Sequence, residues 1–232
     1  MAYHGKKYRA AAAAIDRARL YTLEEGLSAL KKSAAAGFDQ TVELVMKLGI
    51  DPARSDQMVR GTVSLPHGTG KKLRILAFCL PEQAEAVKSA GADFAGGKEL
   101  AEKIKGGWLD FDVAVAAKEM MREITPLGKI LGPRGLMPSP KAGTVSDNLP
   151  RTVKEVKAGK IEFKADKFGN IQVAAGKISF PEGSLAENIR AVIREIVRAR
   201  PPSAKGKYLL QVFISLTMSP SVRLDAGKLA EA

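Results

Sequence analysis

The feature that most constrains the fold is a change of hydrophobic pattern that occurs twice along the chain. In both terminal thirds, apolar residues alternate with polar ones, as in strands that bury one face, and stretches of helical spacing accompany them. Between these thirds, Leu73 to Leu80 is an almost unbroken apolar run, which is typical of a strand covered on both faces. The two patterns predict two kinds of domain in one chain of 232 residues.

The first third predicts one helix and two strands. Thr22 and Glu25 have the spacing of a capping box, so a helix is expected to begin there and to end at Gly37. Residues 42–50 alternate as a strand with one buried face, and residues 59–65 are expected to form a second, antiparallel strand.

The last third predicts a similar mixture. Strands at residues 161–164 and 171–174 are expected to flank a turn at residues 166–170 and so to form a hairpin. Ser184 and Glu187 have capping-box spacing and are expected to begin a long helix. A β-rich strand is expected to follow the prolines that end this helix, and it covers residues 208–218.

The middle third alternates strands with helices in the order β-α-β-α-β, which predicts a parallel sheet with right-handed crossovers. The predicted fold class is therefore α/β with two domains. Residues 1–67 and 159–232 are expected to form one discontinuous α+β domain, and residues 68–158 an inserted Rossmann-like α/β domain.

This sequence lacks the residues that are characteristic of several classes of protein. Cys79 is the single cysteine, so no disulfide forms within the chain, and no usual ligand spacing joins it to His4 and His67 in a zinc site. No apolar run approaches the roughly 20 residues that span a bilayer. We therefore expect a cytoplasmic protein with no membrane partner and no metal or cofactor.

The catalytic motifs are incomplete as well. Gly68 to Lys71 resembles the end of a phosphate-binding loop, but Leu65 and Lys72 depart from the full pattern, and the segment precedes the first parallel strand instead of following it. Asp110 and Asp112 have no third ligand nearby in the sequence and are expected to be solvated. The sequence therefore predicts a binding protein and not an enzyme.

The net charge of +12 favours a polyanionic partner, because each phosphate that Lys or Arg neutralises releases counterions. The excess is +3 in residues 1–67, +4 in residues 68–158 and +5 in residues 159–232. Because the charge is spread in this way, we expect it to lie on folded surfaces and not in a basic tail.

Three segments combine turn chemistry with basic or polar residues. Residues 127–144 form a loop rich in Gly, Pro and basic residues, which either contacts phosphates or is only a rigid surface loop. Phe168 lies in the turn at residues 166–170, where it is either exposed or packed on the hairpin. Residues 215–221 carry hydroxyls around Met218, which suits RNA if Met218 is exposed and a polar strand end if it is buried.

These segments resemble the bacterial ribosomal protein L1 family from about residue 22 to residue 224. The matching stretches are LGKILGPRGLMP (127–138), KAGT (141–144), VRGTVSLPHGTGK (59–71), KFGNIQV (167–173), GKISFP (176–181) and Thr217-Met218. The resemblance implies the two-domain fold described above, with the main RNA contacts in the discontinuous domain.

The resemblance also implies the partners. It predicts a constituent of the large ribosomal subunit that binds 23S ribosomal RNA at the base of a mobile stalk, and that moves with exit-site transfer RNA. It further predicts repression of translation through binding to the messenger RNA of the protein's own operon. The expected location is therefore ribosome-associated.

Residues are carried over by position within the matching segments. The expected RNA-binding residues, which include Phe168 from the turn and Ser219 from the strand end, are Phe38, Thr41, Glu43, Asp166, Lys167, Phe168, Thr217, Met218 and Ser219. Ser219 stands where the family usually has Gly, which would matter if the backbone there required a positive φ. Leu216 removes one possible hydroxyl donor.

Two other functions stay open at this point. An enzyme that used the parallel sheet would carry a bound nucleotide or metal. A scaffold that contacted only proteins would show no salt-dependent affinity for RNA.

Overall fold

The computed structural model describes residues 5–231, and the chain divides into two compact units. One unit contains residues 1–70 and 161–232, so that both termini belong to it, and the other contains residues 71–160. These boundaries lie two or three residues from those expected. We refer to them as the terminal unit and the inserted unit and describe each by itself.

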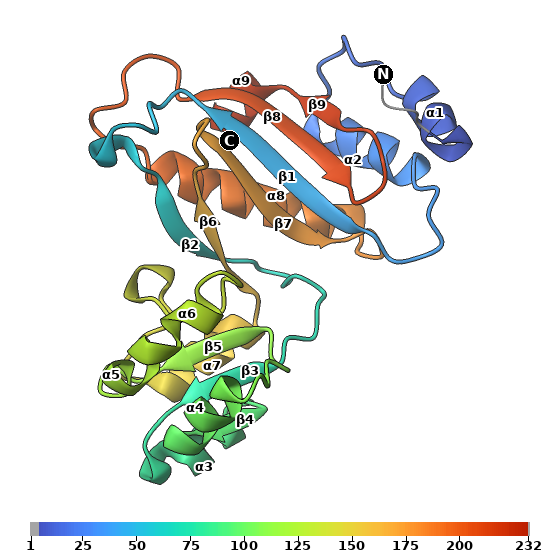
Figure 1. The fold of residues 1–232 in the computed structure, drawn as a ribbon. Helices are drawn as coiled ribbons and strands as arrows, with labels where there is room; N and C mark the ends of the chain where they lie inside the picture. The colour runs from blue at the N-terminus through green and yellow to red at the C-terminus, as the bar shows by residue number, and fades with distance from the viewer. Residues whose placement is uncertain (1–4, 232) are drawn as a thin grey trace. The chain divides into compact units, whose positions relative to one another are not determined.

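The terminal unit is built on a four-stranded antiparallel sheet with the order β7-β1-β8-β9. Helices α2 and α8 cover one face of this sheet and leave the other face open (Figure 1). In β1, even-numbered residues such as Leu44 and Met46 are buried beneath the helices, whereas Glu43 on the open face is exposed. The strands are β1 (Thr41–Leu48), β7 (Asn170–Lys177), β8 (Leu209–Leu216) and β9 (Val222–Leu224).

The helices of the terminal unit differ from the expected ones at their ends. The capping box is confirmed, because the Thr22 hydroxyl accepts a hydrogen bond from the Glu25 N–H and the Glu25 carboxylate accepts one from the Thr22 N–H. However, α2 ends at Lys32 and not at Gly37, because the buried Ser33 hydroxyl donates to the Leu30 carbonyl and the chain then turns. The helices are α1 (Lys6–Ala13), α2 (Leu23–Lys32), η1 (Ser55–Gln57), α8 (Glu182–Arg198) and α9 (Ala226–Glu231).

The predicted start of the long helix α8 was wrong. Pro181 is its N-cap residue, with no capping side chain, and the Pro181 carbonyl already accepts a hydrogen bond from the Leu185 N–H at 3.1 Å. The helix therefore begins at Glu182, two residues before the expected Ser184. Its apolar face buries Leu185, Ile189 and other aliphatic residues against the sheet.

The predicted hairpin around residues 166–170 was also wrong. The strand before this turn, β6 (Lys160–Lys164), pairs with β2 (Arg60–Ser64), whereas β7 after the turn pairs with β1. The turn itself is closed by a hydrogen bond of 2.8 Å from the Asp166 N–H to the Asn170 carbonyl. The chain passes from one sheet to the other at this turn, so the two flanking strands never form a ladder.

The inserted unit contains the predicted parallel sheet. Strand β3 (Ile75–Phe78) lies between β4 (Phe94–Gly96) and β5 (Val113–Ala116), and both pairings are parallel. All four residues of β3 are buried, as expected of a strand covered on both faces. The longer helices of this unit are α3 (Pro81–Ser89), α4 (Lys98–Lys105) and α7 (Leu149–Lys157).

The predicted Gly- and Pro-rich loop at residues 127–144 contains several short helical turns. Leu127 and Leu131 are fully buried and anchor this segment, so that Lys129, Arg134 and Lys141 remain exposed. The short elements in and before it are α5 (Met121–Ile124), η2 (Thr125–Leu127), α6 (Gly128–Leu131) and η3 (Pro140–Ala142).

Within the residues that the structure describes, no helix combines the length and the apolar character that a bilayer-spanning segment needs.

Candidate nucleic-acid interface

The start of β1 and the end of β8 lie side by side at one end of the four-stranded sheet. Their antiparallel register pairs Val42 with Leu216, and the Thr41 N–H donates a hydrogen bond of 3.2 Å to the Thr217 hydroxyl. This contact joins two residues that are 176 positions apart in the chain. We call the surface that results the ledge, and its residues are Phe38, Thr41, Glu43, Thr217, Met218 and Ser219.

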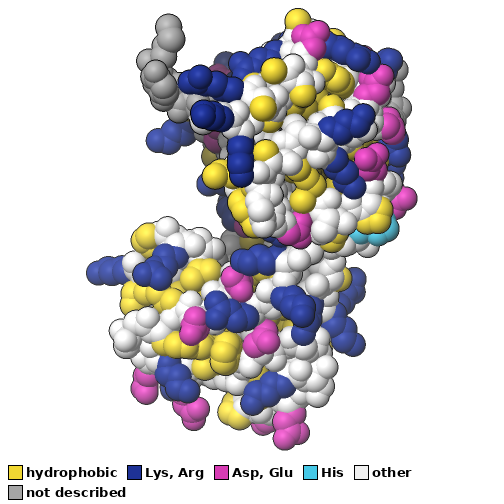
Figure 2. Space-filling model, turned by 90° about the vertical axis from the view of Figure 1, so that its right-hand side faces the viewer, with side chains coloured by type: hydrophobic (Ala, Val, Ile, Leu, Met, Phe, Trp, Pro, Cys, Tyr) yellow, Lys and Arg dark blue, Asp and Glu magenta, His cyan; other side chains and the backbone are white. Residues whose placement is uncertain are grey.

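The apolar side chains of the ledge face solvent. Met218 is 66% exposed and Phe38 is 53% exposed, so the interpretation of Met218 as a core residue was wrong. Large exposed apolar side chains that gather at one place on a monomer often mark a binding surface. On the face of the terminal unit shown in Figure 2, hydrophobic side chains lie among Lys and Arg side chains and among Asp and Glu side chains.

A lysine next to the ledge brings a positive charge to it. The Lys177 ammonium donates hydrogen bonds to the Thr41 hydroxyl at 3.0 Å and to the Asp39 carbonyl at 3.3 Å. The Asp39 carboxylate in turn accepts hydrogen bonds from the N–H and the hydroxyl of Ser179. These bonds fix the segment that leads into β1, so that the ledge is preorganised.

A buried glutamine, which the sequence analysis missed, connects the two halves of the ledge. Gln40 is only 1% exposed, and its side-chain oxygen accepts a hydrogen bond of 3.0 Å from the Met218 N–H. Its carbonyl also accepts a hydrogen bond from the Ile178 N–H. In the sequence, Gln40 lies between the polar residues Asp39 and Thr41, and this position does not predict that its side chain is buried.

The serine that replaces the usual glycine causes no backbone strain. Within residues 5–231, every residue with a positive φ is a glycine, so Ser219 lies in an ordinary region of backbone space. Its hydroxyl accepts a hydrogen bond from the Leu216 N–H and donates one to the Pro220 carbonyl, both at 3.1 Å. Ser219 therefore stabilises the turn at the strand end.

The structure does not bring Asp166, Lys167 and Phe168 to the ledge. Thr41 pairs with Lys177 and Lys47 pairs with Asn170, so the turn that carries these three residues lies at the opposite end of β1. Six residue steps of a strand separate the two ends by about 20 Å. The nine expected residues therefore form two separate groups on the terminal unit.

The Asp166 carboxylate has a structural function in its turn. One oxygen accepts hydrogen bonds of 2.8 Å from the N–H groups of Asn170 and Phe168, and the other accepts one of 3.1 Å from the Asn170 side chain. These hydrogen bonds, above all the one from the Asn170 N–H, hold the pKa of the Asp166 carboxyl below its ordinary value of 3.8. The carboxylate thus stays charged, and its oxygens accept hydrogen bonds from within the turn.

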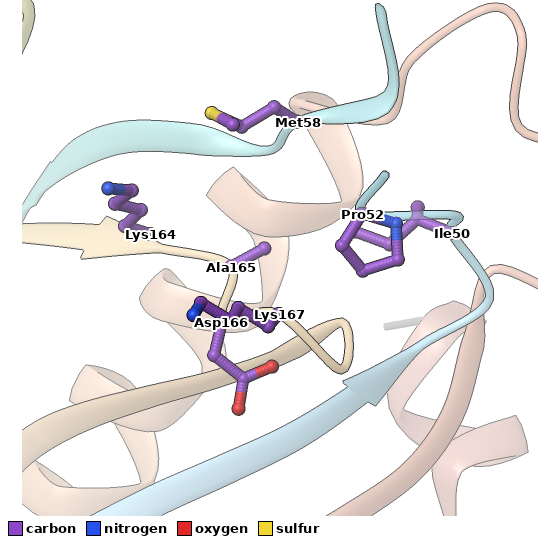
Figure 3. A pocket seen from close by; sticks show the side chains of 7 residues that line it. All are labelled: Ile50, Pro52, Met58, Lys164, Ala165, Asp166 and Lys167. Carbon is purple, nitrogen blue, oxygen red and sulfur yellow. The ribbon is translucent and has the colours of Figure 1, made fainter. Parts of the chain in front are cut away.

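A cavity of about 420 Å³ opens beside this turn (Figure 3). Its apolar lining comes from the segment after β1 and from Ala165, and Lys164 and Lys167 are the basic residues in its wall. Phe168 lies nearby in the turn and is 72% exposed, so the interpretation of Phe168 as packed on a hairpin was wrong. The lining residues are Ile50, Pro52, Met58, Lys164, Ala165, Asp166 and Lys167.

The segment that resembles a phosphate loop has a structural explanation. The buried Asn188 side chain accepts a hydrogen bond from the His67 N–H and donates to the carbonyls of Gly68 and Ala175. Gly68 and Gly70 both have a positive φ, which explains why glycine occurs there. The glycines therefore shape a connection that α8 holds in place.

The two aspartates that were candidates for a metal site are paired with cations. Asp112 accepts hydrogen bonds from the Lys71 ammonium at 2.8 Å and from the Arg74 N–H at 3.1 Å, which lower the pKa of its carboxyl. Asp110 pairs with the Arg74 guanidinium at 3.0 Å. The expectation of a solvated side chain is confirmed for Asp110, which is 71% exposed, and was wrong for Asp112, which is only 22% exposed.

The remaining candidate ligands are also accounted for. Cys79 is fully buried, and burial raises the pKa of its thiol. His67 pairs with Glu187 at 2.6 Å, and His4 lies outside the described residues. Within those residues, no group of three His, Cys, Asp or Glu side chains is arranged to hold a metal ion.

Fold and surface together define a basic, mixed α/β protein with an exposed polar and apolar ledge. The chain belongs to the ribosomal protein L1p/L10e family, whose model matches residues 30–220.

Individual relatives match over nearly their whole length. The chain is 52% identical to the large ribosomal subunit protein uL1 of Chlamydia trachomatis serovar D over 229 residues, which is 99% of both chains. It is 50% identical to the uL1 protein of Beutenbergia cavernae over 98% of this chain and 96% of that protein. The uL1 protein of Protochlamydia amoebophila is 53% identical over 95% of this chain and 93% of its own length.

Proposed function

We propose that this protein is a structural constituent of the large ribosomal subunit in the bacterial cytoplasm, and that it binds 23S ribosomal RNA at the base of a mobile stalk. The observation that carries the proposal is the ledge, where Thr41 bonds to Thr217 and Gln40 bonds to Met218 while Met218 and Phe38 face solvent. Membership of a ribosomal protein family supports RNA as the ligand.

In this proposal, the discontinuous terminal unit is the RNA-binding domain. The inserted unit is a Rossmann-like domain, and the parallel pairing of β3 with β4 and β5 supports this description.

The ledge has the chemical groups that RNA recognition needs. Hydroxyls such as that of Thr217 can donate to and accept from ribose 2′-hydroxyls, which distinguish RNA from DNA. Glu43, exposed beside Ser215 in the sheet register, is an acceptor for 2′-hydroxyls or base amino groups and is unsuited to phosphates. Met218 and Phe38 supply apolar surface for a base or a ribose. The ledge thus reads a folded RNA by shape and sugar contacts.

The positive charge supplies attraction over longer distances. Lys177 lies next to the ledge, and Lys167 lies at the other end of the sheet beside its cavity. In the inserted unit, Lys129, Arg134 and Lys141 are exposed on the segment at residues 127–144. Each lysine that contacts a phosphate is expected to contribute about one unit to the dependence of log affinity on log salt concentration.

Two further activities follow from the same proposal. The basic surface of the inserted unit assists the movement and release of exit-site transfer RNA. The ledge also binds the messenger RNA of the protein's own operon and so represses its translation. Because one surface serves both RNAs, the ribosomal RNA fragment and the messenger RNA should compete for the protein.

The test is a binding titration with the stalk-base fragment of 23S ribosomal RNA. Met218→Asp introduces a negative charge at the most exposed apolar residue of the ledge, so affinity should fall at least about tenfold. Thr217→Val should weaken binding as well, because it removes a hydroxyl. Leu210→Asp is the matched control, since Leu210 is an exposed apolar residue at the end of β8 that lies away from the ledge.

Unchanged affinity in both ledge variants, with unfolding temperatures like that of the wild type, would remove the ledge from the interface. A nucleotide or metal bound stoichiometrically in native mass spectrometry would instead favour an enzyme. The absence of any salt-dependent affinity for RNA would favour a protein scaffold.

A further inference from the structure

A second cavity, of about 540 Å³, lies next to the ledge. Helix α1 forms one wall with Lys7 and Tyr8, and the segment after α2 forms another with Ala35 and Ala36. The residues 217–219 of the ledge complete it. The cavity therefore brings together three parts of the chain that lie far apart in the sequence, and the sequence analysis assigned no function to α1 or to the two alanines.

The charged side chains of α1, which forms one wall of this cavity, are all positive. This helix contains Lys6, Lys7 and Arg9, which are exposed, and it contains no acidic residue. A surface of this kind attracts a negatively charged ligand. The match to the family model begins at residue 30, so α1 lies outside the matched stretch.

The walls of the cavity carry different chemical groups, and these groups match the base, the ribose and the phosphate of one nucleotide. Tyr8 is an aromatic ring that is partly buried at the wall, and Met218 contributes an exposed, polarisable thioether. An unpaired base stacks on an aromatic ring, and a ribose 2′-hydroxyl bonds to a side-chain hydroxyl such as that of Thr217. Lys7 is available for the adjacent phosphate. An acidic peptide would interact with the positive charge of α1. It would supply neither a base to stack on the Tyr8 ring nor a ribose hydroxyl to bond to the Thr217 hydroxyl.

The size of the cavity also favours a single nucleotide. Cavities of about 300 to 1,000 Å³ hold small molecules. An unpaired base can leave its stack and enter such a cavity, whereas a base pair within a duplex cannot. The small side chains of Ala35 and Ala36 keep this space open.

We propose that the cavity between α1 and the ledge binds one unstacked nucleotide of the RNA, with its base between Tyr8 and Met218 and its phosphate near Lys7. This inference rests on the proposed function, since the nucleotide belongs to the RNA that the ledge binds. It adds α1 to the interface and gives the interface a site for a single base.

The first experiment uses the full-length protein and the stalk-base fragment of 23S ribosomal RNA with 2-aminopurine placed at each unpaired position in turn. One position should change its fluorescence on binding, because its base leaves the RNA stack. Tyr8→Leu should abolish this change and lower affinity about five- to hundredfold, the range expected for loss of one base-stacking contact. Tyr8→Phe keeps the ring and should preserve both signals.

Two further variants test the space and the charge. Ala36→Leu should fill the cavity and weaken binding without removing any group that could contact RNA. Lys7→Gln should reduce the salt dependence of log affinity by about one unit. Lys205→Gln is the control, because Lys205 is an exposed lysine of the same unit that does not line the cavity. Thermal unfolding of each variant verifies that the fold is intact.

The outcomes separate this inference from the proposed function. If Met218→Asp weakens binding while Tyr8→Leu, Ala36→Leu and the fluorescence have no effect, the ledge remains and the nucleotide site is wrong. If Met218→Asp and Thr217→Val also have no effect, the ledge is not part of the interface and the proposed function itself fails. If a photo-crosslinking residue at position 8 captures a protein and not ribosomal RNA in assembled large subunits, a protein occupies the cavity and the inference is wrong.

Discussion

At the scale of single residues, two exposed carboxylates in the expected RNA-binding segments have different surroundings. Glu43 lies on the open face of the sheet, where its neighbours in the register are Ser215 and Ala174. Asp166 instead accepts three hydrogen bonds within its own turn. Glu43 is therefore available to a ligand, whereas any change at Asp166 also changes the turn that holds Lys167 and Phe168.

The hydrogen bonds of Asp166 predict a dependence of stability on pH. The pKa of its carboxyl is lower in the folded protein than the ordinary 3.8, so the charged form stabilises the fold above that value. This contribution is lost as the pH falls below about 4 and through the folded pKa. Asp166→Asn should lower the unfolding temperature by a few degrees at pH 7 and should flatten its decline in acid.

The measurement is a series of thermal unfolding curves at decreasing pH. Asp56→Asn serves as the control, because Asp56 is an exposed carboxylate on η1 outside this turn. Curves for Asp166→Asn and wild type that stay parallel through the acid range would contradict the structural function assigned to Asp166.

At the scale of elements, β1 organises the whole terminal unit. It pairs with β7 on one side and β8 on the other, and it separates the ledge from the turn at residues 166–170. At its end, the Gly49 N–H donates a hydrogen bond of 2.7 Å to the Tyr208 carbonyl just before β8. A Cβ atom at Gly49 would lie 2.3 Å from the Lys207 carbonyl oxygen, so this close approach requires glycine.

Gly49→Ala should therefore destabilise the terminal unit. The clash is with backbone, which cannot move aside without shifting the strand, and overpacking of this kind costs about 1 to 3 kcal/mol. Denaturant unfolding measures the change in free energy. Gly183→Ala is the matched control, because a Cβ atom there meets no atom within 4 Å and Gly183 lies within α8. That variant should be neutral or slightly more stable; equal behaviour of the two variants would contradict the prediction.

At the scale of the whole molecule, each unit has its own hydrophobic core. The terminal unit buries residues such as Leu44 and Ile189, and the inserted unit buries Ile75, Phe78 and Val115 around its parallel sheet. The ledge and both cavities described above belong to the terminal unit alone. The two units are therefore expected to differ in function as well as in topology.

A separate core predicts that the inserted unit folds independently. Residues 71–160, produced alone, should show a cooperative thermal transition and the far-ultraviolet circular dichroism of a mixed α/β protein. The same fragment should not bind the stalk-base RNA with the affinity of the full protein, because it lacks the ledge. A fragment that unfolds without cooperativity would show that its core depends on the terminal unit.

Much of the fold was predictable because secondary structure depends on residues that are close in sequence. The capping box of α2 and the buried strand β3 both follow from local spacing. Strand pairing was less predictable. The turn at residues 166–170 has the pattern of a hairpin, yet β6 pairs with β2, which lies about 100 residues earlier in the chain.

The sequence by itself determined the two kinds of domain, the charge, and, through resemblance, the segments that form the ledge. Only the tertiary structure decided which of those residues meet. It joined Thr41 to Thr217, buried Gln40 beneath Met218, separated Asp166 from both by the length of β1, and placed Tyr8 beside the ledge. The physical reason is that periodicity reports how a segment is buried, whereas proximity depends on the partners that each strand and helix finds across the chain.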